Sequence, residues 1–144
     1  MYTNIVVGIS NLIAIFMCGK VKIIEYKIII YLSMVASLLY HIAESKYDKF
    51  IINPLNISID NLLLFDRICV VIAFVVSIIK IIKYSCKINN KFIIIMFIGL
   101  VCLVKSEYNM IIDFEYIISN NDYLYYHTIW HICAFYCLTE ILKT

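Results

Sequence analysis

The sequence is poor in helix-breaking residues and in charge. Its 144 residues include three glycines and one proline, and 15% of them are charged, whereas 64% are hydrophobic. So few glycines and prolines exclude a collagen-like chain or a flexible linker. The high apolar content excludes a disordered chain, because disordered segments are rich in charge and poor in apolar residues. The small net charge of +2, with its lysines scattered along the chain, gives no indication of nucleic acid as a partner.

Paired cysteine motifs are also missing. None of the six cysteines forms a Cys-x-x-Cys pair, so neither a zinc knuckle nor a thioredoxin-like motif is predicted. Cys86 lies in a lysine-rich connection, and the other five lie in apolar runs, where a cysteine is usually a small apolar side chain. These five are Cys18, Cys69, Cys102, Cys133 and Cys137. We therefore expect no disulfide framework.

Long apolar runs dominate the rest of the sequence, and the mean hydropathy is +0.94. Because a transmembrane helix needs about 20 mainly apolar residues, we predict an all-α, multi-pass integral membrane bundle that forms one domain over residues 1–144. The predicted spans are Ile5–Gly19, Ile23–Ala43, Ile59–Ile82, Phe92–Val104 and Asp122–Leu142. No basic residue precedes the first run, which favours an uncleaved helix over a signal peptide. The stretch Ser106–Asn121 is too polar for a lipid-facing span, and is either a sixth short helix or an interfacial segment with a loop.

The distribution of charge predicts the orientation, because Lys and Arg concentrate on the cytoplasmic side of membrane proteins. With five spans and the N-terminus outside, the inner side holds the lysines of segments 20–27 and 80–91 together with Lys143. The outer side then holds most of the acidic residues. We therefore predict five spans, N-out and C-in. Six spans would place the C-terminus outside, which the charges support less well, and 144 residues hardly accommodate seven.

The most informative residues are ionisable groups within the predicted spans. All three histidines, His41, His127 and His131, lie in such spans, as does Asp66. Ionisable groups inside a membrane cost a few kcal/mol on insertion scales and mark functional sites by default. His127 and His131 are four residues apart, which places them on one face of a helix and suits two ligands of a single metal ion. Ser37 precedes His41 by the same spacing.

The depths of these residues agree under the N-out orientation. A helical rise of about 1.5 Å per residue places His127 and His131 about 7 and 13 Å below the outer start of the last span. The same rise places Asp66 and Ser37 each about 10 Å from the outer ends of their spans, with His41 closer to the surface. An even number of spans would put the two histidines of the last span on the opposite side. The matching depths and the charge distribution therefore both support an odd number of spans.

Three imidazoles and a carboxylate in an apolar pocket indicate a catalytic zinc site. Catalytic zinc keeps three protein ligands and leaves a fourth position for water, whose pKa the metal lowers to about 7. In this interpretation His41, His127 and His131 bind the metal, Asp66 takes the proton of the water, and Ser37 donates a hydrogen bond to the water or to a developing oxyanion. The alternative is that the histidines and Asp66 hydrogen-bond across helices and only hold the bundle together.

These residues, in this order, resemble the CREST superfamily of membrane hydrolases. Its shared pattern is Ser-x-x-x-His on the second helix, an Asp on the third and His-x-x-x-His on the last. Here the pattern reads Ser37–His41, Asp66 and His127–His131, and the Trp before the final His is most similar to the transmembrane protein 8/myomaker branch. The resemblance covers most of the chain, from about Ser37 to Cys137. The departure is size, because family members typically have seven spans.

The resemblance implies a zinc-dependent hydrolase that cleaves an amide or ester of a membrane lipid near the outer leaflet. It also implies an alternative from another class, because myomaker-like proteins are associated with membrane fusion and have no established hydrolase reaction. The chain would then be a membrane-remodelling or scaffold protein with a structural metal or hydrogen-bonded histidine site. A transporter is a third option, but no internal repeat or pair of broken helices favours it.

Overall fold

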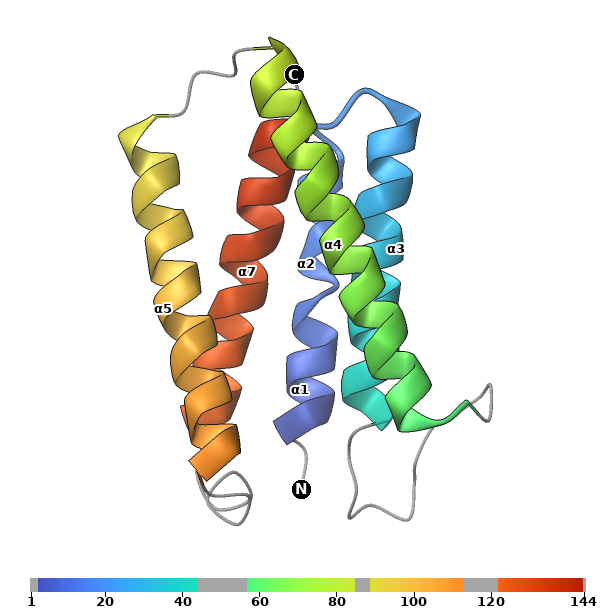
Figure 1. The fold of residues 1–144 in the computed structure, drawn as a ribbon, viewed down its shortest axis with the longest axis vertical. Coiled ribbons are helices and arrows are strands. Elements are labelled where there is room, and N and C mark those ends of the chain that lie inside the picture. The colour runs from blue at the N-terminus through green and yellow to red at the C-terminus, as the bar shows by residue number, and fades with distance from the viewer. Residues whose placement is uncertain (1–2, 44–56, 85–88, 113–121, 144) are drawn as a thin grey trace.

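The computed structural model describes residues 3–43, 57–84, 89–112 and 122–143, and these residues form a bundle of helices (Figure 1). No strand occurs among them, so the all-α prediction is confirmed for the part of the chain that is described. The helices are α1 (Thr3–Ser10), α2 (Ile13–Cys18), α3 (Ile24–Ala43), α4 (Ile59–Tyr84), α5 (Asn90–Ile112) and α7 (Asp122–Leu142).

The boundaries of α3, α4 and α7 agree with the predicted spans to within two residues. The starts of α4 and α5 are capped by side chains: the Ser58 hydroxyl accepts the N–H of Asn61, and the Asn89 side chain accepts the N–H of Phe92 at 2.8 Å. Such caps satisfy backbone donors that have no partner within the helix.

The prediction for the polar stretch after Val104 was wrong in its first part. Ser106 and Glu107 lie within α5, which continues to Ile112, and are therefore not part of a loop or a separate helix. The polar residues do not end the helix because Ser106 is fully buried and its hydroxyl donates to the Leu103 carbonyl of the same helix. The remainder of the predicted segment, residues 113–121, lies outside the described residues.

The first predicted span is also different, because it is broken between α1 and α2. The Asn11 side chain donates to the Gly8 carbonyl at 3.1 Å, and the Ser10 hydroxyl donates to the Val7 carbonyl. The Asn11 backbone N–H bonds to the Gly8 carbonyl, three residues back, and Leu12 repeats this pattern with Ile9. Asn and Ser side chains compete with the backbone for carbonyls in this way. The result is a tight turn in the middle of an apolar segment.

Helix α7 lies at the centre of the bundle and contacts α1, α2, α3, α4 and α5. Together α1 and α2 run beside α7 between α5 and α3 (Figure 1). A hydrophobic core fills the end of the bundle where α2 and α7 end and α3 begins, with Ala14, Ile30, Phe135 and Leu142 among its buried residues. The opposite end, where α3 ends and α7 begins, contains the polar residues predicted from the sequence.

Two glycines allow helices to approach closely near this polar end. A Cβ atom at Gly99 of α5 would lie 2.8 Å from the Cβ of Cys133 in α7, which is closer than real Cβ atoms approach. A Cβ atom at Gly8 of α1 would lie 3.4 Å from the Cβ of His41 in α3. Small residues at helix interfaces commonly permit such close packing in membranes. Here they bring α5 against α7, and α1 against the helix that carries His41.

A buried lysine holds the other end together. Lys80 of α4 is 2% exposed, and its Nζ donates to the Leu142 carbonyl at 3.1 Å, at the C-terminus of α7. The same Nζ lies 4.4 Å from the centre of the Tyr26 ring of α3. A cation at a helix C-terminus interacts favourably with the helix dipole and with the last carbonyl groups. Lys80 therefore connects three helices.

The outer surface of the bundle is strongly apolar. On α4, Phe74 is 65% exposed and Ile82 is 75% exposed, and many other large apolar side chains on this helix are exposed as well. Among the described residues, α3 and α4 are long and apolar enough to cross a membrane, and Ile5–Cys18 forms a shorter apolar segment. Helices α5, with 23 residues, and α7, with 21 residues, have similar lengths. A continuous exposed apolar surface is typical of a protein that faces lipid or a partner.

The two termini lie at opposite ends of the bundle (Figure 1). If the bundle spans a membrane, we therefore expect the N-terminus and the C-terminus on opposite sides, with Lys91 on the side of the C-terminus. The measurement is labelling by a membrane-impermeant thiol reagent, with single cysteines placed at each terminus and at Lys91 in a chain whose native cysteines are replaced.

The matched control is Ile30→Cys, which should resist labelling from both sides because Ile30 is fully buried. Labelling of both termini from the same side would contradict the five-span orientation.

Candidate metal centre

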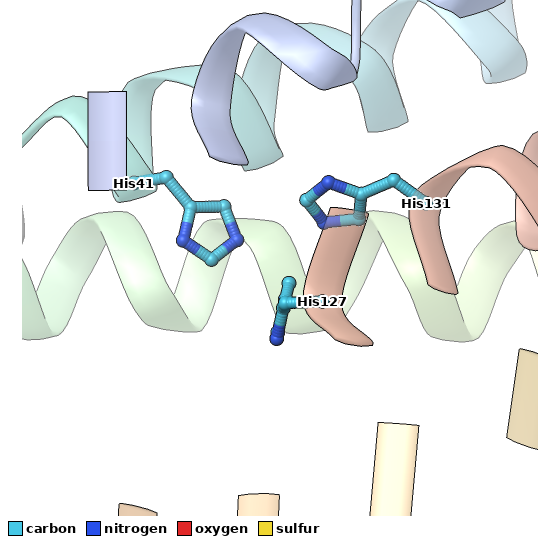
Figure 2. Close-up of side chains that lie close together, drawn as sticks. All are labelled: His41, His127 and His131. Carbon is cyan, nitrogen blue, oxygen red and sulfur yellow. The ribbon is translucent and has the colours of Figure 1, made fainter. Parts of the chain in front are cut away.

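The three histidines come together although the described helices α4 and α5 lie between His41 and the other two in sequence. His41 lies in the last turn of α3, and His127 and His131 lie in the first half of α7. One ring nitrogen from each histidine can be chosen so that the three atoms lie within 4.8 Å of one another. The rings face a common space (Figure 2), with centroids 4.8 Å apart for His127 and either neighbour and 5.2 Å apart for His41 and His131.

All three imidazoles are buried, with exposed fractions of 2% for His41, 7% for His127 and 4% for His131. Histidines are seldom gathered in an apolar interior, because burying polar groups costs free energy unless they are paired. The three rings also meet edge to face, at interplanar angles between 61° and 86°. In this arrangement their nitrogens converge, as ligands of one ion must.

The serine and aspartate predicted from the sequence lie beside the histidines. The Ser37 hydroxyl is 3.4 Å from Nε2 of His131, across the contact between α3 and α7. Asp66 of α4 is close enough to His41 to interact electrostatically, but it does not belong to the group of potential metal ligands. Its Oδ1 atom is buried and has no hydrogen-bond partner among the described residues. A catalytic role is one explanation for a buried polar atom without a protein partner.

Two further serines contact the histidines, and the sequence analysis did not identify either of them. The Ser10 hydroxyl, at the end of α1, lies 2.8 Å from Nδ1 of His131. The Ser106 hydroxyl, in α5, lies 3.3 Å from Nδ1 of His127. A carboxylate oxygen of Glu107 is 3.9 Å from the same nitrogen. The outer nitrogens of both α7 histidines therefore face polar groups from neighbouring helices.

An aromatic residue near the start of α7 also belongs to the site. Tyr123 is 4% exposed, and its ring centroid is 4.9 Å from that of His127. Its position beside Tyr125 and Tyr126 is typical of an aromatic belt at a membrane surface. The structure separates them: Tyr125 is 61% exposed, and the Tyr126 hydroxyl accepts a hydrogen bond from Lys105. Tyr123 differs from Tyr125 and Tyr126 in its burial, which could not be predicted from the sequence around it.

The residues fit a divalent metal ion that prefers imidazole. Tetrahedral zinc with Zn–N distances of about 2.0–2.1 Å requires its nitrogen ligands to lie about 3.4 Å apart. The three rings, with nitrogens within 4.8 Å, need to close by no more than about 1.5 Å, which side-chain rotations can supply. Three buried histidines can thus hold one metal ion.

The five cysteines that the structure describes take no part in the centre. Cys18, Cys69, Cys102, Cys133 and Cys137 are all buried and free. None of them belongs to a group of three potential metal ligands among the described residues. Their interpretation as small apolar side chains agrees with this arrangement.

Comparison of the chain with protein-family models, curated proteins and solved structures finds no match.

The geometry predicts one metal ion per chain, bound by His41, His127 and His131. Replacing any of these histidines by Ala should weaken zinc binding by more than the ~10- to 100-fold that loss of an outer hydrogen-bond partner causes. Elemental analysis of the detergent-purified protein, followed by titration of the metal-free form with zinc, measures the effect.

Cys133→Ala and Cys137→Ala are the matched controls, because both side chains are buried on α7 near the histidines and should not affect metal content. Full zinc occupancy in a His127→Ala, His131→Ala double variant would exclude this ligand set.

Proposed function

We propose that the protein is a multi-pass membrane hydrolase that uses zinc to cleave an amide or ester bond of a lipid, in the manner of the CREST superfamily. The observation that carries this proposal is the combination of three converging buried imidazoles with a buried carboxylate oxygen of Asp66 that has no hydrogen-bond partner. Histidines alone would suit a structural site. A carboxylate beside them that is not itself a ligand is what hydrolysis requires.

Membrane location is supported by the surface of the bundle. Helices α3 and α4 have the length and apolarity of membrane spans, and the exposed side chains of α4 are mostly large and apolar. The polar site is enclosed within the bundle, whereas Lys27, Lys83 and Lys91 lie near the opposite ends of the helices that carry them. In the proposed orientation the site lies near the outer leaflet, within reach of the linkage between a lipid headgroup and its acyl chain.

The chain's own residues divide the chemistry between them. A zinc ion held by three imidazoles acts as a Lewis acid and lowers the pKa of a bound water to about 7. The free Oδ1 of Asp66 is the general base that takes a proton from the attacking water and later returns it to the leaving group. The Ser37 hydroxyl, 3.4 Å from Nε2 of His131, donates a hydrogen bond to the oxygen that becomes negatively charged in the transition state.

A scaffold without catalysis is the second candidate, and a specific observation favours it. Serines of α1, α3 and α5 contact the two histidines of α7 at 2.8–3.4 Å. Hydrogen bonds between membrane helices contribute about 0.6 kcal/mol on average, so these contacts could hold the bundle together without any reaction. A myomaker-like role in membrane remodelling or fusion would then require the packed helices and no hydrolytic reaction.

The variant Asp66→Asn separates the two candidates. The amide keeps the size of the carboxylate and much of its hydrogen bonding but cannot take a proton. In the hydrolase the variant should keep its fold and its zinc and lose about 10²- to 10⁴-fold in turnover. The assay follows fatty-acid release from a panel of ceramides and glycerolipids in detergent or in vesicles.

Asp60→Asn is the matched control, because Asp60 lies on the same helix with an exposed side chain and should have no effect. If the zinc-loaded wild type releases no more fatty acid than Asp66→Asn from every lipid, the scaffold is the correct function.

A further inference from the structure

The two serines that face the outer nitrogens of the α7 histidines share the same arrangement. The Ser10 hydroxyl lies 2.5 Å from the Val7 carbonyl oxygen, three residues back in α1. The Ser106 hydroxyl lies 2.8 Å from the Leu103 carbonyl oxygen, three residues back in α5. Two oxygens this close require a hydrogen between them, and a carbonyl has none to give. Each serine therefore donates its single proton to the backbone of its own helix.

This arrangement determines what each serine can offer to its histidine. A hydroxyl that has donated its proton can only accept a second hydrogen bond. Since the Ser10 oxygen lies 2.8 Å from Nδ1 of His131, that nitrogen must carry the hydrogen of the bond. The same holds for Nδ1 of His127, 3.3 Å from the Ser106 oxygen. A neutral imidazole has one N–H, so Nε2 of both rings keeps its lone pair.

We propose that Ser10 and Ser106 are positioning residues that hold His131 and His127 as Nδ1–H tautomers and so direct both Nε2 lone pairs into the metal centre. This inference rests on the proposed metal site and extends it to two helices, α1 and α5, that contribute no ligand. Metal-binding histidines generally donate their other ring N–H to an oxygen acceptor, which fixes the ring orientation. Here the acceptors are two hydroxyls, each held by its own helix backbone.

An independent contact agrees with this assignment. Nε2 of His131 faces the Ser37 hydroxyl of α3 at 3.4 Å, on the side of the ring away from α1. A serine can donate to an unprotonated Nε2, so the metal-free site is satisfied by the same tautomer that the metal requires. Little rearrangement of protons is then needed when an ion binds.

The turn between α1 and α2 explains why Ser10 can act in this way. In an uninterrupted helix the Val7 carbonyl would accept the backbone N–H of Asn11. At the turn this N–H bonds to the Gly8 carbonyl instead, at 3.1 Å, and the Val7 carbonyl accepts from the Ser10 hydroxyl and, at 3.4 Å, from the Asn11 side chain. Gly8 also lets α1 approach α3 beside His41. The broken first helix is thus a support for the site and not an irregularity of the fold.

The experiment compares wild type with Ser10→Ala and Ser106→Ala, all labelled with ¹⁵N-histidine. Long-range ¹H–¹⁵N spectra of the metal-free proteins distinguish a protonated from an unprotonated ring nitrogen, and competition with a chelator measures zinc affinity. In wild type, His127 and His131 should both be Nδ1–H tautomers. Each Ala variant should shift its own histidine toward the Nε2–H form and weaken zinc binding about 10- to 100-fold.

Two control variants separate positioning from packing. Ser77→Ala removes a buried hydroxyl of α4 that donates to the Ala73 carbonyl at 2.7 Å, so it should cause a similar loss of packing and leave tautomers and zinc affinity unchanged. Ser10→Thr retains the hydroxyl and should preserve the wild-type tautomer of His131.

The outcomes are distinguishable from those of the hydrolase proposal, because the tautomer is read without zinc or substrate. Nε2–H tautomers in the wild type would overturn the inference, as would Ser10→Ala and Ser106→Ala variants with wild-type tautomers and zinc affinity. If the protein shows the predicted tautomers and zinc affinities but cleaves no lipid, the inference is supported and the hydrolase proposal is contradicted.

Discussion

The structure depends on the burial of three imidazoles, beside the half-buried carboxylate of Asp66, within an apolar bundle. Polar groups in such an environment cost several kcal/mol when they have no partner, so each must be paired by the protein or by a ligand. The pairing is incomplete in an informative way: serines contact the α7 histidines, whereas Oδ1 of Asp66 has no hydrogen-bond partner among the described residues. The central position of α7 agrees with this need for partners. It carries two of the imidazoles and contacts α1, α3 and α5, the helices whose serines face them.

The same constraint accounts for features that would otherwise weaken the bundle. A turn in an apolar segment forfeits helical hydrogen bonds, but here the Val7 carbonyl accepts a hydrogen bond from the Ser10 hydroxyl instead of the Asn11 backbone N–H. Glycine in a helix costs about 1 kcal/mol relative to alanine, but at Gly99 it allows α5 to approach α7 beside the site. At the other end the apolar core and the buried Lys80 hold the helices together, so the site does not have to supply the stability of the fold.

Much of this organisation could be predicted from the sequence, because ionisable residues are rare in apolar runs. The spacing of His127 and His131, and the two predicted spans between them and His41, identified residues that the fold brings together. Ser10 and Ser106 could not be found in this way, because a serine in a helix commonly bonds its own backbone and carries no sign of a second partner. The polar residues after Val104 were interpreted as the end of the fourth span. In the structure the helix continues through Ser106, whose hydroxyl faces His127.

The central claim is that the metal is bound by imidazoles and that the five buried cysteines do not contribute. X-ray absorption at the zinc edge of the loaded protein tests it most directly, because nitrogen and sulfur ligands differ in distance. The account predicts a shell of nitrogen and oxygen at about 2.0–2.1 Å with outer-shell scattering from three imidazole rings. A sulfur shell at about 2.3 Å, or scattering from fewer than three rings, would contradict it.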